Sequence, residues 1–153
     1  MGLGICLEEK MNNPHNPVAR KSGLVVQDVP DEVLVYDLDT NKAHCLNKTA
    51  AMVWQSCDGT RTVPQIAEHV GSLSGEKVSD DFVWLAIDQL NESDLLERSV
   101  AADFKGMSRR DVIKRIGLTS MIALPVIASL VAPPTAMAAA SCNCTTNGDC
   151  ALP

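Results

Sequence analysis

The sequence predicts an α+β domain, in which a three-stranded antiparallel sheet is followed by three helices, then by an apolar helix and a disordered cysteine-rich tail. Short apolar runs separated by turn residues fill positions 24–46. The hydrophobic period changes to three and four residues from position 47. Residues 116–148 contain no charged side chain. A chain of 153 residues accommodates one such small domain with appendages.

Three short runs are expected to be the strands of the sheet: 24–26, 33–36 and 42–46. Pro30-Asp31 is typical of a turn between the first two strands, and residues 37–41 are typical of a turn before the third. Residues 1–23 lack a regular pattern and hold several Asn and Pro residues, so we expect a flexible arm there.

Three amphipathic helices are expected after the sheet, at about 48–57, 63–71 and 80–92. Each begins behind a side chain that can accept a hydrogen bond from the first turn: Asn47, Thr62 and Ser79. Gln65 completes a capping box with Thr62. Apolar side chains at helical spacing should face the core: Ala50, Val53, Trp54, Cys57, Val63, Ile66, Ala67, Val70, Val83, Ala86, Ile87 and Leu90.

A long ordered motif lies across the first two helices. It reads Leu46-Asn47-Lys48-Thr49-Ala50-Ala51-Met52-Val53-Trp54, then Cys57-Asp58-Gly59-Thr60-Arg61-Thr62-Val63, then Ile66-Ala67. On these residues, positions 24–98 closely resemble the PqqD-like family, the pyrroloquinoline-quinone synthesis D protein and its relatives, also called RiPP recognition elements. The resemblance implies a small winged-helix-like domain that binds the leader part of a ribosomally made precursor peptide. It also implies that the domain presents this peptide to a modifying enzyme, often a radical SAM protein.

The resemblance further implies a peptide-binding groove between the third strand and the third helix, here residues 42–46 and 79–90. A leader peptide can add to the edge of a sheet, where backbone hydrogen bonds supply affinity and side-chain pockets supply register. Placed by position alone, the candidate groove residues are Ala43, His44, Cys45, Val83, Ile87 and Leu90. A core role is the plainer alternative for the last three.

No pattern in the sequence indicates catalysis, a metal site or a cofactor. The three histidines are isolated, and neither a glycine-rich phosphate loop nor a nucleophile elbow occurs. Residues 1–100 hold 8 Lys/Arg against 16 Asp/Glu, a balance of −8, which disfavours binding to nucleic acid. The sequence therefore indicates a binding protein rather than an enzyme.

A second unit, residues 107–140, follows a linker at 99–106 and resembles a twin-arginine signal. Ser108, Arg109, Arg110 and Lys114 occupy the signal-like positions, and an apolar run and an Ala136-Met137-Ala138 site follow. Signals normally begin a chain, so three explanations stay open: an alternative start at Met107, a membrane anchor used in place, or a fused leader that is exported after cleavage. We expect a cytoplasmic front domain, with the C-terminal segment membrane-associated or exported.

The tail, residues 141–153, places Cys142, Cys144 and Cys150 among small polar residues. Such termini are typical of modified peptide cores, in which cysteine and threonine supply nucleophiles. A disulfide-bonded exported stub, or three thiols on a soft metal, are the alternatives.

Three functions remain in competition. The first is recognition of a precursor peptide, with the chain's own tail as one candidate, for a modifying enzyme encoded elsewhere. The second is a membrane-tethered adaptor for export or assembly of a redox protein. The third is a winged-helix DNA-binding regulator, which the acidic charge disfavours.

Overall fold

The computed structural model of the chain describes residues 16–98, 100–101, 104, 106–119 and 122–131. Six strands lie within these residues: β1 (Val18–Ala19), β2 (Leu24–Val29), β3 (Glu32–Asp37), β4 (Lys42–Asn47), β5 (Leu96–Arg98) and β6 (Ile127–Val131). Four helices complete the described structure: α1 (Lys48–Ser56), α2 (Val63–Ser74), α3 (Asp80–Glu92) and α4 (Arg109–Thr119). The α+β class predicted from the sequence is therefore confirmed.

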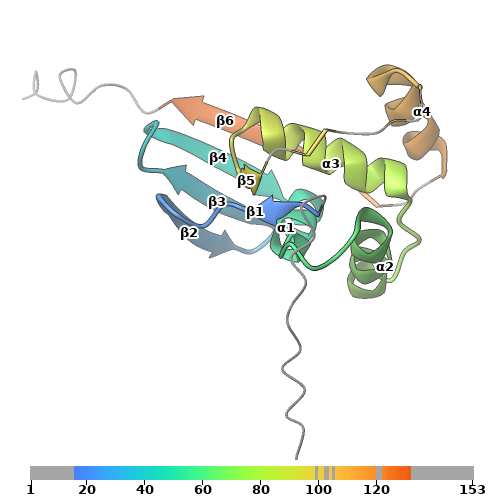
Figure 1. Cartoon of the computed structure of the whole chain (residues 1–153), viewed down its shortest axis with the longest axis horizontal. Coiled ribbons are helices and arrows are strands. Elements are labelled where there is room, and N and C mark those ends of the chain that lie inside the picture. The colour runs from blue at the N-terminus through green and yellow to red at the C-terminus, as the bar shows by residue number, and fades with distance from the viewer. Residues whose placement is uncertain (1–15, 99, 102–103, 105, 120–121, 132–153) are drawn as a thin grey trace, which may run out of the picture.

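The main sheet has four strands in the order β2-β3-β4-β6, and all neighbours are antiparallel. The predicted three-stranded meander forms β2, β3 and β4, but the strand count was wrong because β6 joins the open edge of β4 (Figure 1). β1 and β5 make a separate two-stranded ladder. Residues 16–23, expected as part of a flexible arm, thus contain a strand, and the Asn16 side chain is buried.

The helix starts follow the predicted caps. The Asn47 side chain accepts a hydrogen bond from the backbone of Ala50, and the Ser79 side chain accepts one from Phe82. Thr62 heads α2 with the expected capping box. α2 continues past its predicted end at Gly71 and stops at Gly75, whose left-handed φ of 75° suits glycine.

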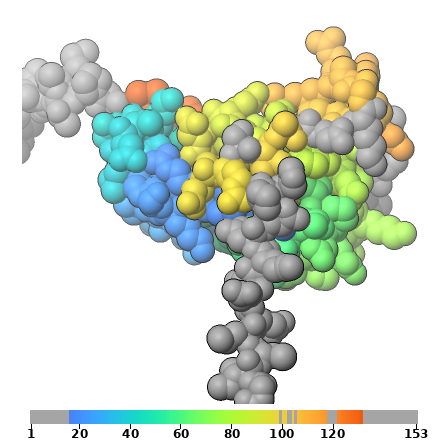
Figure 2. Space-filling view, in the orientation of Figure 1, coloured from blue at the N-terminus to red at the C-terminus, as the bar shows by residue number. Residues whose placement is uncertain are grey.

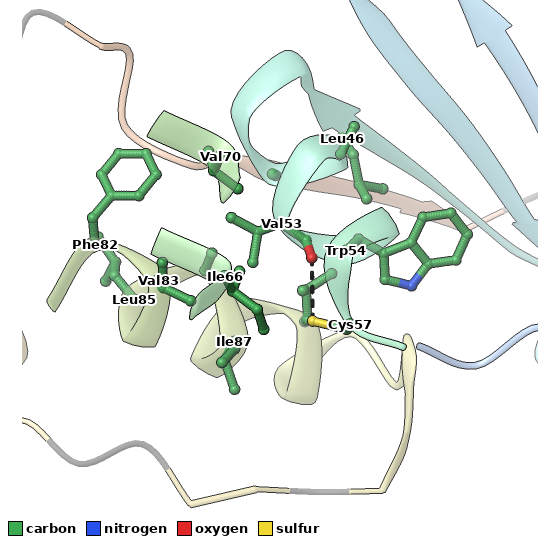
Figure 3. Close-up of a cluster of buried hydrophobic side chains, with 14 of the residues drawn as sticks. Leu46, Val53, Trp54, Cys57, Ile66, Val70, Phe82, Val83, Leu85 and Ile87 are labelled. Atoms are coloured by element: carbon green, nitrogen blue, oxygen red, sulfur yellow. Dashed lines mark hydrogen bonds between the residues drawn. The ribbon is translucent and has the colours of Figure 1, made fainter. Parts of the chain in front are cut away.

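The core lies between the helices and one face of the sheet. Figure 3 shows Val53 of α1, Ile66 of α2 and Val83 of α3 converging, and all three are fully buried. The thiol of Cys57 donates a hydrogen bond to the carbonyl of Val53 at 3.2 Å. Burial raises the pKa of the Cys57 thiol to about 12, so this cysteine serves as a small apolar core residue.

The expected apolar C-terminal helix is wrong over residues 127–131, which form the strand β6. The helix that does form, α4, spans 11 residues and carries the basic part of the segment. Across the described ranges, none of the helices is long and apolar enough to cross a membrane. A short apolar run is compatible with either a helix or a strand, and pairing with β4 makes residues 127–131 a strand.

Candidate functional site

The chain's own residues 107–119 and 122–131, here called the docked segment, contact α3 and β4, the two elements expected to form the groove. α4 packs against α3, and β6 pairs with β4. In Figure 1, α4 lies on the opposite side of α3 from α1 and α2. In the space-filling view, α4 forms a lobe at one end of the molecule and β6 emerges beyond β4 (Figure 2).

The strand part of this contact has a defined register. Ile127 faces Leu46, Ser129 faces His44, and Val131 faces Lys42. The antiparallel ladder occupies backbone donors and acceptors of β4. Without β6, these groups would lie on an exposed edge of the sheet.

The side-chain amides of Asn47 and Gln89 form hydrogen bonds with the backbone just before β6. The Asn47 side chain donates to the carbonyl of Leu124 at 2.7 Å and accepts from the backbone N–H of Val126 at 3.1 Å. Its backbone N–H also donates to the Val126 carbonyl, at 3.1 Å. On α3, Gln89 donates to the carbonyl of Pro125 at 2.9 Å. Asn47 therefore both caps α1 and fixes the position of the segment.

The helix part of the contact combines an ion pair with apolar burial. Arg109 contacts Glu92 through Nη1 at 2.7 Å and Nη2 at 3.2 Å, and its Nε lies 3.2 Å from Asp88. The hydrogen bond from Arg109 lowers the pKa of the Glu92 carboxyl. Val112 and Ile116 are 0% and 3% exposed, so the first turns of α4 are tightly seated.

His44 of β4 lies directly opposite Ser129 of β6 in the sheet. Its Nδ1 is 2.8 Å from the hydroxyl of Ser129, and the residue is buried. Its Nε2 has no hydrogen-bond partner among the described residues. Burial lowers the pKa of His44, so the neutral ring is favoured at this contact.

Comparison with known proteins covers the part of the chain that forms β3, β4, α1 and α2. Residues 32–75 match the family model described as Coenzyme PQQ synthesis protein D (PqqD). The chain contains a PqqD-like region. Proteins of that family are peptide-recognition elements that work with radical SAM enzymes in PQQ biosynthesis. Neither the curated proteins nor the solved structures gave a match.

The PqqD-like region contributes β4 to the groove, whereas α3 lies beyond the matched residues. Of the residues predicted for the groove, Ala43 and Cys45 pair with β6, and His44 contacts it. Cys45 also donates a hydrogen bond to Glu32 at 2.8 Å, which raises the pKa of its thiol. The peptide-binding role of these three residues stays a prediction.

The three candidate groove residues on α3 face the core, the alternative that the sequence left open. Val83, Ile87 and Leu90 are fully buried in the core, where Figure 3 shows the first two beside Ile66. Other α3 side chains contact the docked segment instead: Asp88, Gln89 and Glu92. Sequence reasoning missed these three, and Asn47 was recognised only as a helix cap. Their polar character, on the helix face opposite the apolar stripe, is the signal that could have suggested a contact surface.

Of the signal-like residues, Ser108 precedes α4, Arg109 and Arg110 begin it, and Lys114 lies in its middle. The hydroxyl of Ser108 contacts Asp111 at 2.6 Å and accepts from its backbone N–H at 3.3 Å, which caps the helix. Arg109 is held by α3, while Arg110 and Lys114 are exposed. The predicted modification residues Cys142, Cys144 and Cys150 lie outside the described residues.

Proposed function

We propose that this protein is a peptide-recognition module whose ligand is its own segment 107–131, and that it presents the following cysteine-rich tail to a modifying enzyme of the radical SAM type. The observation that carries the proposal is the pairing of β6 with β4 in the groove beside α3. This arrangement is strand addition to a sheet edge, a common mode of peptide recognition, supplied here within one chain.

Covalent linkage suits such a ligand. Residues 99–106 connect the domain to the segment, and a short connection of this kind gives an effective concentration of about 1 mM or more. A weak intrinsic affinity is then enough to keep the groove occupied. We expect the ligand to be able to dissociate, because Leu130 and Val131 are 68% and 71% exposed and its ion pairs with α3 are partly exposed.

The geometry also limits where chemistry can occur. β6 ends at Val131, and Cys142 follows 11 residues later. An extended chain of that length reaches about 36–40 Å. An enzyme that contacts the domain within this radius can act on Cys142, and one that binds farther away cannot.

Docking within the chain is tested by hydrogen exchange on the full-length protein. Val112→Asp places a charge at a fully buried position and should release the segment, whereas Ile113→Asp alters a neighbouring side chain that is 38% exposed. We expect β4 and β6 to lose amide protection only in Val112→Asp, with β2 and β3 protected in both. Unprotected β6 amides in the unsubstituted chain would exclude the docked ligand.

Presentation is tested by intact and fragment mass spectrometry of the chain purified from its own host. We expect mass changes on Cys142, Cys144 or Cys150 beyond the two hydrogens lost per disulfide. Val112→Asp should reduce these changes strongly, and Ile113→Asp should preserve them. An unmodified chain recovered in membranes would contradict presentation and support the membrane-tethered adaptor.

A further inference from the structure

One arginine of the signal-like motif is held by two carboxylates of α3. Glu92 contacts both terminal nitrogens of Arg109, at 2.7 and 3.2 Å, and Asp88 contacts its Nε at 3.2 Å. Asp88 and Glu92 are four residues apart on one helix and therefore share a face. All three nitrogens of the guanidinium group thus have a carboxylate partner.

This contact distinguishes arginine from lysine. A planar guanidinium presents several donors in fixed directions, whereas an ammonium is a single charge that cannot bridge two carboxylates with the same geometry. The next arginine, Arg110, is exposed. The α3 surface therefore binds the first arginine of the pair, Arg109, and favours arginine over lysine at this position.

The apolar residues that follow the two arginines also contact the domain. Val112 and Ile116 are buried against the domain, and residues 127–131 of the apolar run are paired with β4. A receptor for a twin-arginine signal reads adjacent arginines followed by an apolar stretch. The domain and such a receptor would consequently need the same residues.

We propose that Asp88 and Glu92 form a binding site for the first arginine of the twin-arginine motif, and that docking masks this motif from the export receptor. The proposal rests on the docked state described under the proposed function. Export then requires that the segment leave the groove. The domain holds the chain on the cytoplasmic side while the tail is exposed to its modifying enzyme, so modification precedes export.

The test uses the full-length chain in a bacterium with a twin-arginine export system. Export is measured as the fraction of the tail peptide removed by proteinase K from intact spheroplasts, quantified by mass spectrometry. The key variant is Asp88→Asn with Glu92→Gln. The matched control is Glu68→Gln with Glu76→Gln, which removes two exposed carboxylates outside α3. A strain that lacks the receptor defines the background.

We expect the α3 variant to increase export about two- to thirtyfold, the range that loss of two partly exposed ion pairs allows. The control pair should match the unsubstituted chain. Adding Arg109→Lys and Arg110→Lys to the α3 variant should return export to background. Unchanged export in the α3 variant, or an increase that survives loss of both arginines, would overturn the proposal.

The hydrogen-exchange measurement separates this proposal from the proposed function. If β6 is unprotected in the unsubstituted chain, the docked ligand itself is absent. If β6 is protected and the tail cysteines are modified, but the α3 variant is exported no better than the control, only the masking proposal fails.

Discussion

The PqqD-like region and the docked segment are stabilised in different ways. The region at 32–75 places fully buried apolar side chains such as Leu46, Val53 and Ile66 in the common core. Among the described side chains of the docked segment, Val112 and Ile116 are buried, and the β4–β6 ladder and the bonds from Asn47 and Gln89 add hydrogen bonds. Much of β6 faces solvent, with Leu130 and Val131 68% and 71% exposed.

Because of this difference, we expect the docked segment to dissociate under milder denaturing conditions than those that unfold the core. Each fully buried large apolar side chain contributes about 1.5–3 kcal/mol, whereas an exposed ion pair contributes about 0.2–1 kcal/mol. We therefore expect the segment to leave the groove under conditions in which the core remains folded. A recognition domain needs this order of events, because it must release its ligand without unfolding.

The largest effect should come from the core. Ile66→Ala removes a fully buried side chain and should lower the free energy of unfolding by about 2–5 kcal/mol. Leu73→Ala, at a side chain that is 60% exposed, is the matched control and should change stability little. Urea denaturation followed by circular dichroism measures both. Equal effects at the two positions would contradict the assignment of Ile66 to the core.

The next effect should come from a buried charge in the sheet. Burial would raise the pKa of Asp37, but hydrogen bonds from Asp39, Thr40 and Arg20 outweigh burial and lower it to about 2. A depressed pKa stabilises the fold above the unfolded value of 3.8 and loses this contribution as pH falls towards 2. Asp37→Asn should therefore cost about 1–3 kcal/mol at neutral pH and flatten the acid transition.

Thermal denaturation between pH 2 and pH 7 measures this effect. The control is Asp31→Asn, at an exposed position in the turn between β2 and β3. An acid transition of unchanged steepness in Asp37→Asn would show that other carboxyl groups determine it.

A smaller and more informative effect should come from Asn47, which serves both regions. Asn47→Ala removes the α1 cap and the bonds to the segment, so it should cost about 0.5–2 kcal/mol and also expose β6 to exchange. Asn47→Asp keeps the capping oxygen but loses the donor to Leu124. It should therefore expose β6 while preserving α1. Hydrogen exchange that reports the same loss at α1 in both variants would contradict this separation.

The smallest effect should come from mild acid. Burial lowers the pKa of His44, so its stabilising contribution is present above the unfolded value of 6.5 and is lost as pH falls below it. The nearby charges act in both directions: Asp37 and Asp94 raise the pKa, and Lys42 and Arg20 lower it. β6 amides should exchange faster at pH 5.5 than at pH 7.5, after correction for intrinsic rates. His44→Gln should abolish the difference, and a persistent difference would exclude His44 as its source.

Local signals predicted most of the domain. Asn47 and Ser79 marked helix starts correctly because a cap is decided within four residues. The end of α2 was misplaced at Gly71. A side chain there would meet the carbonyl of Glu76 at 2.9 Å, so this glycine permits a close approach rather than ending the helix.

The docked segment could not be predicted in the same way. Residues 127–131 lie in a long uncharged run that suits a helix or a strand, and the free edge of β4 decides between them. Arg109 and its partner Glu92 are 17 residues apart on separate helices, so no local pattern links them. The candidate groove residues were placed by position alone, and their peptide-binding role stays a prediction. The sequence does not show which face of α3 the segment covers, so Asp88, Gln89 and Glu92 were not foreseen.

Reversible docking of the segment has a consequence for how copies of the chain assemble. Within the described residues no strand pairs with its outer side, and departure of the segment would expose β4 as well. Because the same groove is present in every copy, a segment released from one molecule can enter the groove of another. At high protein concentration the chain should therefore form domain-swapped dimers that preserve the contacts between the segment and the groove, and dilution should return them to single chains.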